Sequence, residues 1–299
     1  MIIKLKFKKI SKSFSLDINK DYHNNVVDTW TWDFYKKYKN SPWRWADLPF
    51  RDHITKKKLN YSQFFDKKIT HKINNISILE VGSAMGSAYD FMKKSGLIDL
   101  SNYTGVEVSK IGYSYCKKNY PKGNWLHKDF TKWSNLGKYD YSFERNAVHH
   151  MPSPIEQFEK ILKSTKTSFI TCFRSCLVGE TIADLNISNF KTETGIYYSS
   201  IINLFELINL AIRFGFINIK IVFGGAHEKI STNSNDAHFL SEKINPEKIF
   251  LSRCRVLMVR SDTIYKPKIK FVVRPDTLIK NFEACLLIKK TLKEIKTNF

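Results

Sequence analysis

One stretch decides the fold of this 299-residue chain: Ile78-Leu79-Glu80-Val81-Gly82-Ser83-Ala84-Met85-Gly86-Ser87. It begins as a short apolar strand with an acid near its end, continues through mostly small residues, and runs into a helical pattern from Ser87. Small residues let the backbone approach a ligand closely, and the following helix presents unpaired N–H groups. The stretch therefore predicts a nucleotide-binding turn between a strand and a helix.

The acid at the end of this strand distinguishes the turn from the turn of a dinucleotide-binding fold. The dinucleotide fingerprint is GxGxxG, with the pyrophosphate at the helix N-terminus. Here the spacing is Glu-x-Gly-x-Ala-x-Gly, from Glu80 to Gly86. A carboxylate at this place would repel a pyrophosphate and attract a cation, which points to an ammonium or sulfonium group in the ligand.

With this spacing the chain resembles the class I S-adenosylmethionine (SAM)-dependent methyltransferases, whose first motif is an acid followed by three alternate glycines. Gly82 and Gly86 match the first and third of these, and Ala84 replaces the second. Alanine is the next smallest residue, but it does not reach every glycine conformation. The resemblance implies that SAM is bound by the residues of this motif, namely Glu80, Gly82, Ser83, Ala84 and Gly86.

Two further segments match the family in the correct order. Tyr103-Thr104-Gly105-Val106-Glu107 resembles the second strand, and Glu107, 21 residues after Gly86, stands where family members hydrogen-bond the ribose hydroxyls. Lys128-Asp129-Phe130 resembles the third motif. The resemblance implies that Asp129 reads the adenine amino group and that Phe130 packs on the adenine ring.

The segment from Tyr139 to Met151 resembles the fourth strand and the loop that follows it, which ends in paired histidines. By resemblance, Asn146 contacts the methionine part of the cofactor. For methyl transfer to a hydroxyl we expect a base, and imidazole titrates near neutral pH. His150 is the first candidate and His149 the second, with a purely structural role for the pair as the alternative. The chemistry requires no metal.

Short apolar strands alternate with helical stretches from Ile76 onward, which is typical of a parallel sheet covered on both faces. The predicted strands are 76–81, 103–108, 124–128, 139–144, 168–174, 217–223 and 255–260, and the predicted helices are 87–95, 111–119, 155–164, 200–214 and one starting at 275. We expect an α/β, Rossmann-like methyltransferase fold with a mostly parallel seven-stranded sheet.

Three regions are expected along the chain: an N-terminal arm and aromatic-rich cap (1–72), a SAM-binding domain (73–261) and a C-terminal basic amphipathic helix (262–299). Residues 21–72 contain four of the six tryptophans and no glycine, which favours a small helical cap. Its rings could stack on a sugar or base, or form the core of the cap itself. We expect acceptor specificity in this cap, in the polar connection 177–199 and in the insertion 224–252.

The formal net charge is +21, and it is concentrated at the two ends of the chain. Such a charge attracts polyanions, so nucleic acid, acidic glycans or an anionic membrane surface are partners to consider. However, about forty of the 49 basic residues are lysine and nine are arginine, whereas phosphate and base recognition favours the guanidinium fork. A solvated, lysine-rich surface is therefore the preferred interpretation.

No apolar run is long enough to cross a membrane, and lysines interrupt the first ten residues, which disfavours a signal peptide. The five cysteines show neither a CxxC pair nor a disulfide framework, so we expect a cytoplasmic protein.

The sequence favours a methyltransferase acting on a small molecule or a glycan precursor, with O-methylation ahead of N- or C-methylation. An RNA methyltransferase is the first alternative, although Glu144-Arg145-Asn146-Ala147 stands where amino-methylating enzymes carry Asn-Pro-Pro-Tyr or Asp-Pro-Pro-Tyr. A non-catalytic, cofactor-binding partner subunit is the second alternative.

Overall fold

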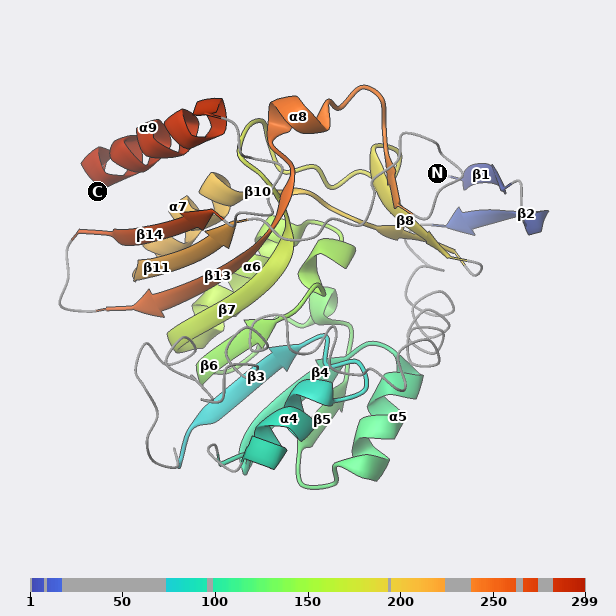
Figure 1. Cartoon of the computed structure of the whole chain (residues 1–299). Helices are drawn as coiled ribbons and strands as arrows, with labels where there is room; N and C mark the ends of the chain where they lie inside the picture. The colour runs from blue at the N-terminus through green and yellow to red at the C-terminus, as the bar shows by residue number, and fades with distance from the viewer. Residues whose placement is uncertain are drawn as a thin grey trace.

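Figure 1 shows a computed structural model of the chain, which describes residues 2–7, 10–17, 74–95, 99–192, 195–223, 238–261, 266–273 and 282–298. The described core is a twisted sheet with helices on both faces (Figure 1). The cap predicted at 21–72 lies outside the described residues.

The central sheet contains β3 (Ser77–Val81), β4 (Asn102–Glu107), β5 (Asn124–His127), β6 (Tyr139–Glu144), β7 (Thr165–Cys176), β10 (Ile202–Asn203), β11 (Phe216–Phe223), β13 (Ser252–Arg260) and β14 (Lys268–Val273). The strand order is β14-β11-β13-β7-β6-β3-β4-β5, and the short β10 pairs with β7. From β5 to β7 all neighbours are parallel, in the order of a doubly wound sheet, while β13 is antiparallel to both β7 and β11. The prediction of a mostly parallel, Rossmann-like sheet is confirmed, but the sheet has nine strands instead of the predicted seven, because β10 pairs with β7 and β14 pairs with β11.

The sheet continues past residue 261, the predicted end of the SAM-binding domain, because β14 pairs in parallel with β11. The first residues of β14 alternate lysine with apolar side chains. In its lysine content the strand is similar to the basic C-terminal segment that follows it, to which the sequence prediction assigns it. In the structure β14 is the last strand of the sheet order, a position where lysines discourage pairing with other chains.

Two groups of helices cover the sheet. On one face lie α4 (Ser87–Ser95) and α5 (Lys110–Asn119), which bury Tyr89, Met92 and Cys116. On the other face lie α6 (Pro154–Ser164), α7 (Leu204–Arg213) and α9 (Phe282–Asn298). Leu79 and Val81 of β3 pack toward the second group and Ile78 toward the first, as expected for a strand buried on both faces.

The predicted polar connection 177–199 contains two strands, β8 (Ser188–Thr192) and β9 (Gly195–Tyr198). They pair with each other, and β8 also pairs with β12 (His238–Leu240) to form a separate three-stranded antiparallel sheet. At the N-terminus, where an arm is predicted, β1 (Ile2–Phe7) pairs with β2 (Ile10–Asp17) in antiparallel fashion.

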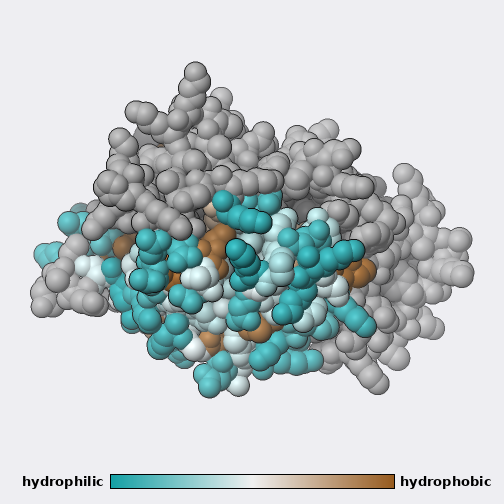
Figure 2. Space-filling view, turned by 90° about the horizontal axis from the view of Figure 1, so that it is seen from below, coloured by the Kyte–Doolittle hydropathy of each residue, from teal (hydrophilic) through white to brown (hydrophobic). Residues whose placement is uncertain are grey.

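The described surface seen from below in Figure 2 is mostly hydrophilic, with apolar residues in small separate areas. Within the described residues, we find no helix that is both long enough and apolar enough to span a membrane.

Candidate active site

The loop between β3 and α4 has an alternating backbone conformation that explains its sequence. Gly82, Ala84 and Gly86 have φ angles of 72°, 46° and 69°, all in the left-handed region that glycine tolerates best. A Cβ on Gly82 would lie 2.4 Å from the Cβ of Ala147, so the loop after β6 leaves room for glycine alone. Ala84 adopts its conformation in spite of its Cβ, which costs about 1 kcal/mol.

The end of β4 holds this loop in place. The backbone N–H groups of Gly82 and Ser83 both donate to the carbonyl of Val106, over 2.9 and 3.1 Å. The N–H of Ala84 donates to Oε2 of Glu107 over 2.5 Å, and Oε1 of Glu107 accepts from the N–H of Ser109 over 2.8 Å. Burial raises the pKa of Glu107 to about 7, against the effect of these hydrogen bonds.

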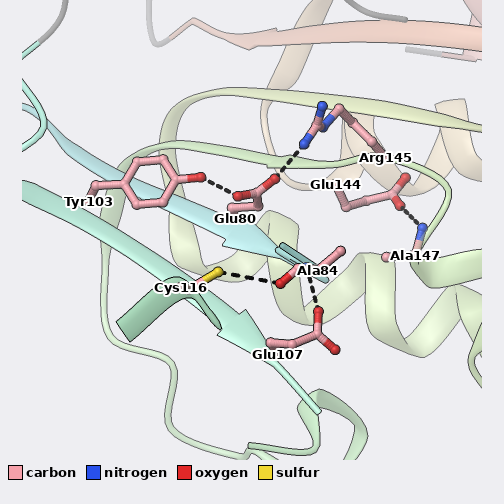
Figure 3. A network of polar contacts seen from close by, with 8 residues as sticks. All are labelled: Glu80, Ala84, Tyr103, Glu107, Cys116, Glu144, Arg145 and Ala147. Atoms are coloured by element: carbon pink, nitrogen blue, oxygen red, sulfur yellow. Dashed lines mark hydrogen bonds and ion pairs between the residues drawn. The ribbon is translucent and has the colours of Figure 1, made fainter. Parts of the chain in front are cut away.

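Helix α5 supports the loop from the other side. The Sγ of Cys116 donates to the carbonyl of Ala84 over 3.4 Å (Figure 3). A Cβ on Gly112 would lie 2.8 Å from the same carbonyl oxygen, so the helix and the loop are in close contact. The loop is thus held in this conformation by three sets of contacts within the chain: its hydrogen bonds to the Val106 carbonyl, the carboxylate of Glu107, and helix α5.

Glu80 is buried and already has two partners within the chain. Its Oε1 forms an ion pair with Nη2 of Arg145 at 2.7 Å, and its Oε2 accepts a hydrogen bond from the hydroxyl of Tyr103 (Figure 3). Burial raises the pKa of Glu80, and the neighbouring guanidinium group opposes this increase. The cation that the sequence predicts beside Glu80 is thus supplied, in part, by Arg145.

The loop after β6 is organised by Glu144, a buried carboxylate to which the sequence analysis assigns no role. Its Oε2 accepts from the N–H groups of Ala147 and Val148 over 2.9 and 3.1 Å, and its Oε1 accepts from the hydroxyl of Thr171. An acid just before a helical turn is a capping signal that the sequence contains, but the contact with β7 is not visible there. Glu144 therefore orients the segment that carries the candidate residues.

Among the buried polar atoms of these loops that have no hydrogen-bond partner in the described part of the chain are Oγ of Ser83 and Nδ2 of Asn146. Asn146 has a left-handed φ of 55°, and its N–H donates to the carbonyl of Cys172 over 2.9 Å. Because buried polar groups are normally hydrogen-bonded, these two atoms fit a site that a polar ligand completes.

Asp129 and Phe130 lie after β5, at the start of the short 3-10 helix η3 (Phe130–Lys132). Oδ1 of Asp129 accepts from the N–H and the hydroxyl of Thr131, over 3.0 and 2.7 Å, so this carboxylate caps the turn. Phe130 is buried in the main core cluster, edge-on to Trp133. His127, the last residue of β5, is exposed and stacks on Tyr113.

The paired histidines form the short helix η4 (Val148–His150), and their ring centroids are 4.0 Å apart. Nδ1 of His150 is 2.5 Å from the carbonyl oxygen of Tyr198, in β9. A carbonyl oxygen only accepts, so Nδ1 carries the hydrogen and the neutral ring keeps its lone pair on Nε2. His149 is buried, and its carbonyl accepts from the N–H of Ser200 over 2.9 Å.

The structure therefore brings part of the connection 177–199 to the histidines. Tyr198 contacts His150, and the ring centroids of Phe190 and His150 are 6.4 Å apart.

Among the residues that the structure describes, no group of three or more His, Cys, Asp or Glu side chains is arranged to hold a metal ion.

No protein-family model matches the chain, and no curated protein matches its sequence. Among solved structures it is similar to the N-terminal domain of EvdMO1 with S-adenosylhomocysteine (SAH) bound, at 11% identity and a TM-score of 0.45, covering 67% of this chain and 78% of that chain. It is also similar to the plantazolicin methyltransferase BpumL in complex with a monoazolic desmethylPZN analog and SAH, at 16% identity and a TM-score of 0.44, covering 81% and 96%. A third is 1,6-didemethyltoxoflavin-N1-methyltransferase of Burkholderia thailandensis, at 9% identity and a TM-score of 0.42, covering 87% and 95%.

Proposed function

We propose that this chain, which has the Rossmann-like fold of the class I SAM-dependent methyltransferases, is a methyltransferase that acts on a small molecule or a glycan precursor. The observation that carries the proposal is the β3–α4 loop. Its left-handed backbone is tied to Val106 and Glu107, and beside it the buried Ser83 Oγ and Asn146 Nδ2 have no partner among the described residues.

The residues at this edge of the sheet fit SAM as a ligand. Glu107 uses one acceptor position on each oxygen for a backbone N–H, and a carboxylate oxygen offers two, so it retains the capacity to accept from ribose hydroxyls. Ser83 and Asn146 would bind polar atoms of the methionine part, together with the backbone of Gly82, Ala84 and Gly86. Glu80 would balance the positive charge, and Asp129 and Phe130 would contact the adenine.

SAM, when bound, supplies a methyl group on a sulfonium whose leaving group needs no activation. The chain has to align the acceptor, exclude water and, for a hydroxyl, remove a proton. We assign the last task to Nε2 of His150, because Nδ1 is engaged by the Tyr198 carbonyl. The acceptor oxygen gains the methyl group, and its proton passes to Nε2. We therefore retain O-methylation as the favoured reaction.

Calorimetric titration with SAM and SAH tests the proposal. The wild-type protein is expected to bind both ligands, and Glu107→Ala is expected to weaken binding at least about tenfold, because a charge-assisted contact to the ligand is lost. Glu156→Ala is the matched control, since Glu156 is an exposed carboxylate in α6. Absence of binding by folded wild-type protein would refute the proposal.

The net charge of +21 is the one observation that favours an RNA substrate instead. The two substrates differ in their salt dependence, because binding to a polyanion weakens steeply as salt rises. A small-molecule enzyme keeps its turnover between low and physiological salt. A partner subunit would bind SAH but transfer no methyl group to any acceptor in a screen.

The cysteines support the proposal of a cytoplasmic protein. The four whose side chains are described, Cys116, Cys172, Cys176 and Cys254, are free thiols and buried. This state is typical of a reducing compartment.

A further inference from the structure

Arg145 is a buried cation that uses only part of its hydrogen-bonding capacity. Its side chain is 7% exposed, and Nη2 forms the ion pair with Glu80 at 2.7 Å. Nε and Nη1 are buried as well and have no hydrogen-bond partner in the described part of the chain. Guanidinium donors that stay buried and unpaired cost free energy, so these atoms indicate a ligand that supplies acceptors.

The contact with Glu80 leaves one edge of the guanidinium group with both of its donors. The group has five N–H donors, one on Nε and two on each Nη, and the hydrogen bond to Glu80 comes from Nη2. One edge pairs a hydrogen of Nη2 with that of Nε, and another pairs the second hydrogen of Nη2 with one of Nη1. Whichever hydrogen of Nη2 Glu80 accepts, the other edge can bind both oxygens of a carboxylate.

Residues of three neighbouring strands hold the guanidinium group in position. In Figure 3 the side chain of Arg145 extends from the loop after β6 to the carboxylate of Glu80, near the end of β3. The other oxygen of this carboxylate accepts from the hydroxyl of Tyr103 in β4, a fully buried side chain. Cζ of Arg145 also lies 5.6 Å from the ring centroid of Phe143 in β6. Tyr103 and Glu80 are therefore positioning residues for Arg145.

The ion pair bridges the place in the sheet where a ligand is expected. In the order β7-β6-β3-β4-β5, the chain runs from β3 to β4 and β5, and then returns to the other side of β3 with β6 and β7. Ligands of open α/β sheets bind outside the carboxyl ends of the strands at such a reversal. Val81 is level with Glu144 in the β3–β6 pairing, so Glu80 and Arg145 lie on the two sides of the reversal.

Two neighbouring donors also have no hydrogen-bond partner in the described part of the chain. Nδ2 of Asn146 belongs to the residue after Arg145, and Oγ of Ser83 belongs to the β3–α4 loop. The two loops are in contact, because a Cβ on Gly82 would lie 2.4 Å from that of Ala147. These donors therefore gather where we place the amino-acid part of SAM, and the carboxylate is the one anionic group of that ligand.

We propose that Arg145 binds the carboxylate of the amino-acid part of SAM, and that Glu80 and Tyr103 orient it for this contact. This inference rests on the proposed function and assigns a residue that the sequence motifs leave out. The ion pair then offers complementary charge to both ends of an amino-acid zwitterion, with the guanidinium group for the carboxylate and Glu80 beside it for the ammonium.

The test compares two ligands that differ only in the carboxylate: SAH and its decarboxylated form, S-adenosyl-3-thiopropylamine. Both are titrated by calorimetry into the full-length protein. Wild-type protein is expected to bind SAH at least about tenfold more tightly, because the carboxylate adds a charge-assisted contact, and Arg145→Gln is expected to bind both ligands equally. Arg260→Gln is the matched control, because Arg260 is partly buried and its neighbour Val259 pairs with Ser168 near the start of β7, at the opposite edge of the sheet. This control is expected to keep the wild-type preference.

Removal of Arg145 alone leaves the carboxylate of Glu80 buried without its cation, which can prevent folding. Two further variants avoid this difficulty. Glu80→Gln/Arg145→Gln removes both charges and is expected to lose the preference for SAH. Arg145→Lys keeps a cation beside Glu80 but has no planar fork, so it is expected to retain only part of the preference.

Two results would overturn the inference while SAH binding still supports the proposed function. One is an equal loss of affinity for both ligands in the Arg145 variants, with the preference for SAH retained, because Arg145 would then only neutralise Glu80. The other is the absence of any preference in the wild-type protein. If folded wild-type protein binds neither ligand, the proposed function is refuted, and the inference with it.

Discussion

Substitution of Gly82 by alanine combines two separable costs, and the structure gives the origin of each. At a φ of 72°, an L-residue costs about 1–2 kcal/mol. The new Cβ would also lie 2.4 Å from the Cβ of Ala147, an overlap that costs about 1–3 kcal/mol to relieve. We expect Gly82→Ala to lower the free energy of unfolding by about 2–5 kcal/mol in total.

Gly137→Ala is the matched control in urea denaturation. Gly137 has nearly the same φ, 74°, but its Cβ would meet nothing within 4 Å. The control therefore measures the backbone cost alone, and the loss of unfolded-state entropy on adding a methyl group is common to both variants. The difference between the two variants reports the overlap with Ala147.

A double-mutant cycle with Ala147→Gly closes the argument. Removing the second Cβ in the Gly82→Ala background is expected to recover the free energy lost to the overlap and to leave the backbone cost unchanged. The reasoning is refuted if Gly82→Ala destabilises the protein no more than Gly137→Ala, or if Ala147→Gly gives no recovery. SAH titration of the same variants then measures how strongly ligand binding depends on this loop.

Three further predictions concern the same site. The folded-state pKa of Glu107 is about 7, above its usual value, so between about pH 4.5 and 7 the folded state holds a proton that the unfolded state has lost. The free energy of unfolding should therefore fall by about 3 kcal/mol as the pH rises through this window. Denaturation of Glu107→Gln across the same window should lack this pH-dependent component. His150→Ala should lower kcat of methyl transfer by about 10²–10⁴-fold with unchanged SAH affinity, whereas His127→Ala, at an exposed ring, should leave kcat intact; equal losses would contradict the role as base. Ala84→Gly should raise the free energy of unfolding by about 1 kcal/mol, since it relieves a left-handed alanine at a φ of 46°, and a decrease in urea denaturation would argue against strain there.

The parallel strands and the glycine loop could be predicted because their signals are local. Apolar runs such as that of β3 report burial on both faces, and left-handed positions select glycine at Gly82 and Gly86. The start of α7 was predicted at Ser200, but the helix begins at Leu204. Asn203 caps it by accepting from the N–H groups of Phe205 and Glu206, a signal that the continuous apolar run concealed.

The remaining features depend on contacts between distant segments. β8 pairs with β12, nearly fifty residues further along the chain. The polar segment that contains β8 therefore forms a strand because of a distant pairing partner, which the sequence of the segment does not indicate. The ion pair of Glu80 and Arg145 likewise joins positions 65 residues apart. The sequence motif identified Glu80, but only the fold brings a guanidinium group to it.

The hydrogen bond from His150 to Tyr198 has a consequence for attempts to change the acceptor by exchanging segments. Its acceptor is a peptide carbonyl, so any side chain at position 198 preserves it, while a graft of residues 188–199 with another backbone path removes it. Such a chimera would retain His150 and the proposed cofactor-binding residues, but the imidazole would lose the contact that places its hydrogen on Nδ1. Exchanges intended to redirect the enzyme should therefore keep the backbone of β9 and vary only its side chains.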